Sequence, residues 1–516
     1  MTATTTTSAA TPAPPPQVAD KGLRRGAIGL AGSIVLGVAQ TAPAYSVAVT
    51  LAFLVGAVGL QSPALLLAGF VPILCMTIVE REFVEREPDA GTVFVWVGRA
   101  LGPRVGWICS WALLAATFIS LANLANIAGT YFFLLVGWDA AAGTEWATIA
   151  VGLVWLGIAT WLGVLGIQLS SRVQAALLSL GLIVLAVFAV VALIKVAAGS
   201  AGSQSIDPSL HWLNPFSAGS SSAFFSGMLL AIFFYWGWDG PAAVAEEASG
   251  GTVTPKRALV YSALALLGFY VVVVIALQAY AGTGTKGIGL GSDAVAGDVL
   301  SPIGAAAIGS WYGTAMELVV MLSAGAALIA ALLPTARSLL SMGAYRAVPN
   351  AFAKVDERNG SPVGATIGCA LAIGGVLIVL SIVSNHVLSD SISAIVLLIA
   401  FYYTLLGLAA LWAFRREATR SAADFGAKFA APLIGTVVLG WALVRNGHDT
   451  IAKDYGFTTL FGLGGVFVIG AATLLIGVLL MVIWNMRAPA FFRGETFSPR
   501  YLEEHRPDLV QHVRGL

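Results

Sequence analysis

Two apolar segments of this 516-residue chain contain helix-breaking residues beside polar ones. Residues 37–46 read GVAQTAPAYS with Pro43 near the middle, and residues 233–241 read FFYWGWDGP with Gly237 and Asp239. Proline removes a backbone donor and frees a carbonyl, and unpaired backbone is tolerated in an apolar phase only where it lines a cavity or is buried in protein. Each interruption therefore predicts a place where backbone amides and carbonyls can bind a polar ligand. For the first, an ordinary proline kink repaired by a nearby hydroxyl is the alternative.

The composition shows what surrounds these segments. Hydrophobic residues make up 58% of the chain, charged residues 10%, and the mean hydropathy is +0.87, so the chain needs lipid as its solvent. A net charge of +1 without a clustered basic face argues against nucleic acid as a partner. The cysteines Cys75, Cys109 and Cys369 are predicted to be small core residues. No metal-ligand spacing and no nucleophile–base pair is found, so neither metal, nor cofactor, nor enzymatic activity is expected.

Twelve apolar stretches are long enough to cross about 30 Å of hydrocarbon. They lie at about 27–56, 62–79, 104–136, 145–166, 173–197, 220–246, 258–281, 310–334, 364–385, 391–414, 428–445 and 460–485. We therefore expect an all-α integral membrane protein with one transmembrane domain over residues 25–485. Residues 1–24 are predicted to be a disordered tail, and residues 486–516 a short solvated tail.

The distribution of basic residues orients these spans. If the amino terminus is cytoplasmic, all of the 27 lysines and arginines fall in cytoplasmic segments except Lys195, Lys286, Arg445 and Lys453. Positively charged loops are retained on the cytoplasmic side. Both termini are thus predicted to be cytoplasmic.

The two interruptions lie five spans apart, as an inverted five-plus-five repeat predicts. Exposed helix ends offer amide donors to an anionic group and carbonyl acceptors to a cationic one. A zwitterion such as an amino acid would suit both ends.

Four segments resemble those of bacterial permeases of the amino acid, polyamine and organocation superfamily, and the resemblance covers residues 25–485. They are 88–103 (PDAGTVFVWVGRALGP), 166–174 (GIQLSSRVQ), 237–257 (GWD, then AEE and PKR), and 335–362 (TARSLLSM, then Pro349 and Ser361-Pro362).

The resemblance implies a leucine-transporter-like fold in the cytoplasmic membrane of a bacterium. It has inverted repeats at about 27–197 and 220–414, peripheral helices at about 428–485, and alternating access around helices 1 and 6. In such permeases, amides of broken helix 1 meet the substrate carboxylate, and carbonyls of helices 1 and 6 meet its amino group. Some proton-coupled relatives carry a lysine in helix 5, at a position near Gly181 here. With the neighbouring polar residues included, the predicted substrate-binding residues are Gln40, Thr41, Ala42, Ala44, Tyr45, Ser46, Asn123, Phe233, Tyr235, Trp236, Gly237 and Asp239, with Phe233 at the position of an aromatic gate.

Two ionisable residues in the spans are candidates for coupling, because charge in a membrane is costly and marks function by default. Asp239 lies in the second interruption, where backbone amides could also satisfy it without a substrate. Glu317 has no cationic neighbour in sequence, so it could bind a proton or a cationic substrate, or stay neutral through burial.

Two further groups of polar residues have structural alternatives. Ser120, Asn123, Asn126 and Thr130 share one helical face, which could line the pathway, bond to the first helix or simply pack. Glu246 and Glu247 end the sixth span against an unfavourable helix dipole, so a basic partner is expected from Lys256, Arg257 or Arg25. That pair would be either a structural ion pair or a cytoplasmic gate.

These features together predict a secondary active transporter that imports an amino acid or related amine, coupled to protons or another ion. A polyamine or organic-cation carrier and an amino acid exchanger are the alternatives within transport. Outside transport, the alternative is a substrate-sensing receptor with the same fold.

Overall fold

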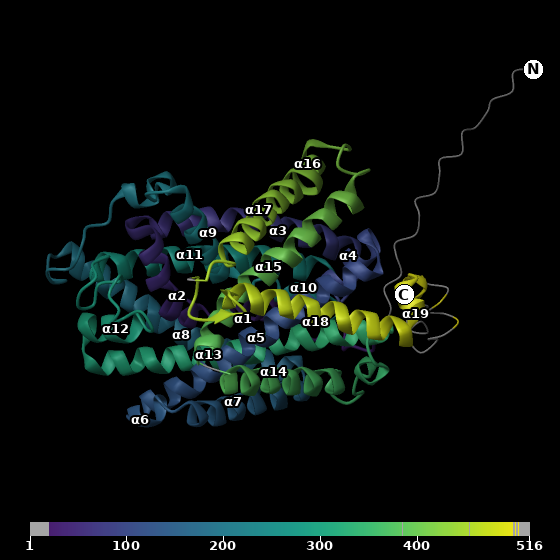
Figure 1. Cartoon of the computed structure of the whole chain (residues 1–516), viewed down its shortest axis with the longest axis horizontal. Coiled ribbons are helices and arrows are strands. Elements are labelled where there is room, and N and C mark those ends of the chain that lie inside the picture. The colour runs from purple at the N-terminus through teal and green to yellow at the C-terminus, as the bar shows by residue number, and fades with distance from the viewer. Residues whose placement is uncertain (1–19, 384, 454, 499–500, 502–503, 505–516) are drawn as a thin grey trace, which may run out of the picture.

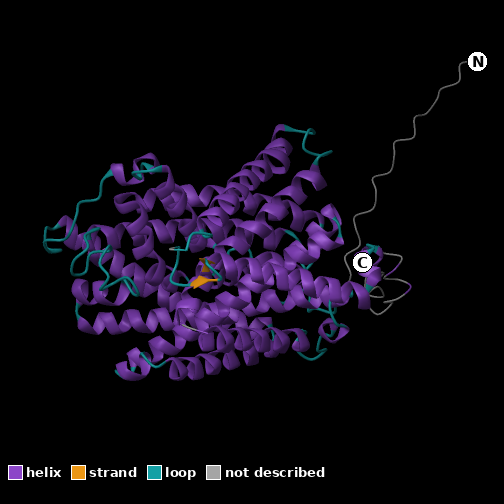
Figure 2. Ribbon diagram, viewed as in Figure 1, coloured by secondary structure: helices purple, strands orange, loops and turns teal. Residues whose placement is uncertain are grey.

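The computed structural model describes residues 20–383, 385–453, 455–498, 501 and 504. In this part of the chain most residues are helical, and most long helices run along the longest dimension of the molecule (Figures 1 and 2). One short antiparallel hairpin, β1 (Thr459–Leu460) with β2 (Leu463–Gly464), is the sheet structure found there.

Ten helical stretches of the described residues are long and apolar enough to cross a membrane, which makes this a multi-pass, all-α membrane protein. The first stretch, Leu30–Arg86, combines α1 (Leu30–Gln40), α2 (Pro43–Val58), the short η1 (Gly59–Gln61) and α3 (Ser62–Arg86). The others centre on α5 (Pro103–Leu135), α7 (Glu145–Leu165), α8 (Ile167–Ala197), α11 (Val253–Ala281), α13 (Ser310–Ala344), α14 (Val363–Val383), α15 (Asn385–Phe414), α17 (Ala431–Asp449) and α18 (Gly465–Arg487).

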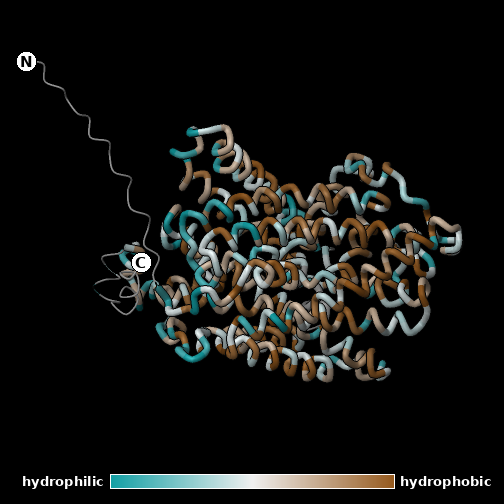
Figure 3. The backbone as a smooth tube through the Cα atoms, turned by 180° about the vertical axis from the view of Figure 1, so that it is seen from behind, coloured by the Kyte–Doolittle hydropathy of each residue, from teal (hydrophilic) through white to brown (hydrophobic). Residues whose placement is uncertain are grey.

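Shorter helices connect the long ones. They are α4 (Val93–Leu101), α6 (Asp139–Ala142), α9 (Ser221–Tyr235), α10 (Gly240–Ala243), α12 (Leu300–Ile308), α16 (Ala422–Phe425), α19 (Pro489–Phe492), the 3-10 turns η2 (Leu210–Leu213), η3 (Pro215–Ser217), η4 (Ala245–Glu247), η5 (Asn350–Ala353) and η7 (Glu495–Phe497), and the π-helical η6 (Gly426–Ala430). Helices α6 and α12 lie at one end of the bundle, and α4 and α19 lie at the other, which we call the α4 end (Figure 1). Hydrophilic residues gather most densely near the α4 end (Figure 3).

Three predicted boundaries differ from the observed ones for physical reasons. Helix α3 continues to Arg86 and α13 to Ala344, because a helix that has left the hydrocarbon can extend through charged residues. The predicted span at 460–485 instead starts with the β hairpin, and its helix begins at Gly465. Hydropathy alone does not separate an apolar hairpin from the first turn of a helix.

Close packing of α5 against α7 depends on glycine. A Cβ atom on Gly129 of α5 would overlap the carbonyl group of Thr148, and one on Gly152 of α7 would overlap the carbonyl group of Ala125. Small residues at such a crossing let two helices approach closely in lipid.

Parts of both predicted tails are buried, and residues 1–19 lie outside the described part. Lys21 and Leu23, assigned to the disordered tail, are buried. The prediction of a solvated carboxyl-terminal tail is wrong for its first part, because Phe491, Phe492 and Phe497 are buried in a cluster that includes Phe94. Aromatic side chains bring enough apolar area to hold such a segment against the bundle.

Candidate substrate site

The first interruption is a true break in the helix. Helix α1 ends at Gln40, Ala42 adopts the left-handed conformation (φ 46°), and α2 starts at Pro43. Proline can begin a helix but cannot continue one, because it has no N–H to donate. The hydroxyl of Ser46 donates to the Thr41 carbonyl (2.7 Å), so hydroxyl groups do repair part of the freed backbone.

Two backbone amides follow Pro43 at the start of α2. The Ala44 N–H donates to Ser323 Oγ of α13 (3.2 Å). The described part of the chain provides no acceptor for the Tyr45 N–H. The first amides of a helix have no partner within it and carry a partial positive charge, so this end of α2 suits an anionic group.

The second interruption has the same character. Helix α9 ends at Tyr235, residues 236–239 are not helical, and α10 begins at Gly240. Gly237 has φ 112°, a conformation that residues with a side chain rarely adopt.

The two breaks lie directly against each other. A Cβ atom on Gly237 would be 3.0 Å from Gln40 Cγ and 3.1 Å from the Gln40 carbonyl oxygen. A Cβ atom on Gly37 would be 2.8 Å from the carbonyl oxygen of Trp238. The glycines therefore allow a backbone-to-backbone approach that larger residues would prevent.

Aromatic residues around the second break are held by hydrogen bonds. Tyr235 is fully buried and donates through Oη to the Leu66 carbonyl (3.1 Å), so its side chain faces α3. Trp236 Nε1 donates to Tyr402 Oη (2.6 Å), and Tyr403 Oη donates to Asp239 Oδ2 (3.1 Å). The sequence prediction missed this tyrosine pair of α15. Two adjacent tyrosines in an otherwise apolar helix were the signal that could have revealed it.

The predicted polar face of α5 contacts other helices instead of the first one. Asn123 Nδ2 donates to the Ile119 carbonyl (2.9 Å) and to Ser391 Oγ of α15 (3.4 Å). Asn126 Oδ1 accepts from Thr148 Oγ1 of α7 (2.9 Å). This face joins α5 to α7 and α15.

The two coupling candidates are in different places. Asp239 lies in the second break and lines a cavity with Gln40. Glu317 is half-buried in α13, where Asp298 and Asp139 are the charged groups that act on it, so it lies toward the α6 and α12 end. Phe233 is also partly buried, at the end of α9.

Small cavities flank the breaks. One of about 40 Å³ lies beside Gln40 and Asp239. Another of about 10 Å³ lies between Pro43, Gly181 of α8 and Ser323. Gly181, where some relatives have lysine, thus faces the first break across an almost filled space. Cavities of these volumes can hold water molecules but not an amino acid.

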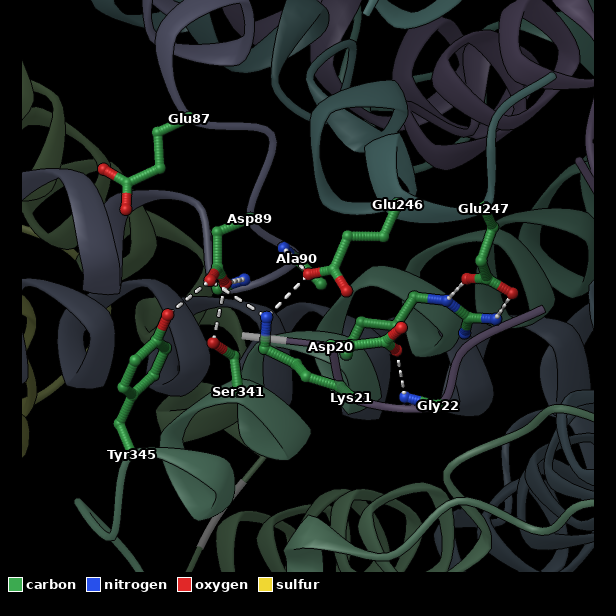
Figure 4. Close-up of polar contacts among 12 residues, drawn as sticks. Asp20, Lys21, Gly22, Glu87, Asp89, Ala90, Glu246, Glu247, Ser341 and Tyr345 are labelled. Carbon is green, nitrogen blue, oxygen red and sulfur yellow. Dashed lines mark hydrogen bonds and ion pairs between the residues drawn. The ribbon is translucent and has the colours of Figure 1, made fainter. Parts of the chain in front are cut away.

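An ion cluster lies near the α4 end, around Lys21 and Asp89 (Figure 4). Lys21 Nζ contacts Asp89 Oδ2 (2.9 Å) and Glu246 Oε1 (2.6 Å), and the Lys21 and Asp89 side chains are fully buried. Asp89 also accepts from Ser341 Oγ (2.8 Å) and Tyr345 Oη (2.9 Å). The cluster connects the amino-terminal segment with the α3–α4 loop, η4 and α13.

Glu247 forms a separate, bidentate pair with Arg337 of α13. Arg337 Nη2 donates to Glu247 Oε1 (2.9 Å), its Nε donates to Oε2, and both side chains are 1% exposed.

The predicted basic partners of Glu246 and Glu247 are therefore wrong. Lys256 pairs with Glu85, and Arg25 pairs with Asp20. None of the ion pairs that the structure gives for the two glutamates involves Lys256, Arg257 or Arg25. The actual partners, Lys21 and Arg337, are remote in sequence, so only the fold brings them near.

Burial and pairing shift the titration of the groups at this end. Burial disfavours the charged form of Lys21, but Asp89 and Glu246 outweigh it and raise the pKa of Lys21 above its ordinary value. For Asp89, burial is outweighed by Lys21, and its pKa is lowered. Glu87 is different: burial raises its pKa to about 7, although Arg99 lies 2.8 Å away and acts in the opposite direction.

Comparison with known proteins identifies the family. The amino acid permease family model matches residues 26–486. The chain belongs to the amino acid permease family. The permease is 27% identical over 440 residues to the branched-chain amino acid permease BcaP of Lactococcus lactis, covering 79% of this chain and 85% of that protein. It is 24% identical over 338 residues to BcaP of Bacillus subtilis, covering 61% and 67%. An uncharacterized transporter of Legionella pneumophila is 26% identical over 202 residues, covering 39% and 42%.

Membership makes the chain a transporter and not an enzyme, and it confirms the predicted resemblance to the superfamily of amino acid, polyamine and organocation permeases.

Proposed function

We propose that this permease is a secondary active importer of a neutral amino acid, with branched-chain amino acids as its first candidate substrates. The contact between the two helix breaks supports a site for a zwitterion, because the Tyr45 amide at the start of α2 is without an acceptor in the described residues. Two relatives are named branched-chain amino acid permeases, and these names suggest a branched side chain for the substrate. The substrate-binding residues predicted from the sequence, the first of which is Gln40 and the last Asp239, remain the proposed contacts.

The proposed architecture is twelve membrane spans with an inverted repeat of five helices. Division of Leu30–Arg86 at η1, and counting α9 with α10 as one interrupted span, would give that number. Broken helices at the first and sixth positions are the arrangement that such a repeat provides around a central site. Alternating access would then be a movement of α1, α2, α9 and α10 relative to the other helices.

The α4 end is proposed to be the cytoplasmic end. It contains the buried ion cluster, and the basic residues of the loops favour the same orientation. In this proposal Glu246 and Glu247 belong to the cytoplasmic gate, and Lys21 and Arg337 hold it closed. Opening toward the cytoplasm would require separation of these pairs.

Proton symport is the proposed coupling mechanism. Asp239 and Glu317 are the residues predicted from the sequence to bind the transported proton. Asp239 is favoured by its position, since it lies in a break and accepts a hydrogen bond from Tyr403. A carboxylate near the substrate can couple proton binding to substrate binding because both respond to the same helix movement.

Transport by purified protein in liposomes tests the proposal. Vesicles with an imposed inward proton gradient should accumulate radiolabelled leucine, isoleucine or valine, and unlabelled amino acid should compete. Uptake of putrescine without uptake of neutral amino acids would indicate an organic-cation carrier. Uptake only against internal amino acid would indicate an exchanger. Binding without flux in any condition would indicate a receptor.

A further inference from the structure

A small cavity beside the second break contains two carboxylates from different helices. It has a volume of about 40 Å³ and is lined by Glu80 of α3 and Asp239, with residues of α1, α4, α5, α10 and α13 around them. Glu80 is 2% exposed and Asp239 is partly buried. The predicted second span ended one residue before Glu80, so a position inside the protein was not expected for this side chain.

In the part of the chain that the structure describes, no basic side chain compensates the two acids. The residues that line the cavity include no lysine, arginine or histidine. Arg337, next to the lining residue Ser338, is bound by Glu247, and Lys428 of η6 contacts Glu417 and Asp424. Two buried carboxylates without a cation are strongly unfavourable in the ionised form, so the cavity requires a positive charge from outside the chain.

Free polar atoms point to the same requirement. Glu80 Oε2, Gln40 Oε1 and Ser338 Oγ are buried and have no hydrogen-bond partner in the structure, and all three residues line this cavity. Ser338 is 3% exposed. Unpaired oxygens of this kind are rare in native proteins and need an explanation, such as a bound ligand or water.

We propose that the cavity is the coupling site of the transporter, in which Glu80 and Asp239 share one transported proton. The proton enters from the outer solution, bonds to a carboxylate oxygen, hydrogen-bonds to the second carboxylate and is released to the inner solution. Gln40 belongs to the first helix break and Asp239 to the second, so loss of the proton changes the charge where the two moving segments meet. This inference rests on the proposed transport function and makes Glu80 the partner that the sequence did not reveal.

Other titratable groups face the site from α15. Tyr403 donates to Asp239, and Tyr402 and Tyr403 both interact electrostatically with Asp239 and Glu80. Tyrosines remain protonated at neutral pH and can donate to an ionised carboxylate, which leaves the two acids as the groups that exchange a proton there.

The test uses Glu80→Gln in the full-length protein in liposomes, with Glu85→Gln as the matched control. Glu85 lies in the same helix, pairs with Lys256 and has a side chain that is 55% exposed. Two rates are measured: exchange of labelled for unlabelled amino acid without a gradient, and accumulation driven by a proton gradient. A gradient of one pH unit allows about tenfold accumulation for one proton.

Wild type and Glu85→Gln should exchange and accumulate the amino acid. Glu80→Gln should still exchange the amino acid, with a rate that varies less between pH 5 and 8 than that of the wild type, but should not accumulate it. Glu80→Asp keeps a carboxylic acid at this position, so it should still accumulate the amino acid, with a shifted pH dependence of the exchange rate. This variant also tests the inference if Glu80→Gln does not fold.

Retained proton-driven accumulation in Glu80→Gln would overturn the inference, as would loss of accumulation in Glu80→Asp. Wild-type accumulation that follows sodium and ignores pH would overturn the choice of a proton. A wild type that neither exchanges nor accumulates any amino acid would instead refute the proposed transport function.

Discussion

Replacing Lys21 with methionine should open the α4 end of the permease. The side chains of Lys21 and Asp89 are fully buried, and that of Glu246 is 13% exposed. Methionine fills a similar volume but leaves two carboxylates without their cation. Breaking a buried ion pair in this way costs about 3–5 kcal/mol.

The hydrogen bonds from Ser341 and Tyr345 to Asp89 remain in the variant, so the lower end of that range applies. A cost of about 3 kcal/mol changes the ratio of closed to open molecules by a factor of more than about 100. Loss of Lys21 also leaves burial as the main influence on Asp89, so the pKa of Asp89 should rise from its lowered value. A carboxyl with a raised native pKa adds stability at low pH that is lost as pH rises. The variant should therefore be less destabilised at pH 5 than at pH 8.

Two measurements check this prediction. Thermal unfolding of the purified protein gives the stability at each pH. Labelling by a membrane-impermeant thiol reagent measures the opening, with Thr335→Cys as the reporter because Thr335 is buried and lines the cavity beside the second break. The natural cysteines that the structure describes are buried, which keeps the background low.

Arg25→Met is the control for the Lys21 variant. Arg25 lies four residues further along the same segment, but its ion pair with Asp20 is exposed, and its loss should cost at most about 1 kcal/mol. If Lys21→Met unfolded and labelled like Arg25→Met at every pH, Lys21 would not hold this end closed, and the reasoning would be refuted.

Three further predictions concern other parts of the molecule. Because burial raises the pKa of Glu87 from 4.5 to about 7, the native state binds its proton more tightly than the unfolded state, and this stabilisation is lost as pH rises from about 4.5 to about 7. Glu87→Gln should flatten the pH dependence of the unfolding temperature in that window, and an unchanged slope would contradict the assignment. Gly237→Ala should force the second break away from Gln40 and reduce the transport rate at least about tenfold, while the protein still reaches the membrane; near-normal uptake would show that the contact is not needed. Gly129→Ala should separate α5 from α7 at Thr148 and lower stability by about 1–3 kcal/mol, which an unfolding midpoint equal to that of the wild type would disprove.

The sequence alone revealed where the helices break. Pro43 cannot continue a helix, and Gly237 permits a backbone conformation that other residues rarely adopt. These are local properties of the chain, and the structure has both breaks where they were predicted. The apolar stretches were likewise visible, because hydropathy is a sum over neighbouring residues.

The partners of the charged residues were decided by the tertiary structure. The sequence suggested Lys256, Arg257 or Arg25 for Glu246 and Glu247, since carboxylates at that helix end need a basic partner, whereas Lys21 and Arg337 hold them. A salt bridge depends on distance in space. Lys21 and Glu246 are 225 positions apart in the sequence, and Glu247 and Arg337 are 90 positions apart. These pairs form only because the bundle brings four segments to one end.

Burial of Glu80 was decided in the same way. At the edge of a predicted span it has the sequence context of a residue that faces water, yet the packing of α3 against its neighbours leaves it 2% exposed. Local hydropathy describes the chain one segment at a time. Whether a carboxylate near the end of a segment faces solvent or the protein interior is set by the helices packed around it. The sequence therefore determined the positions of the two helix breaks, whereas the tertiary structure decided that Glu80 is buried beside the second one.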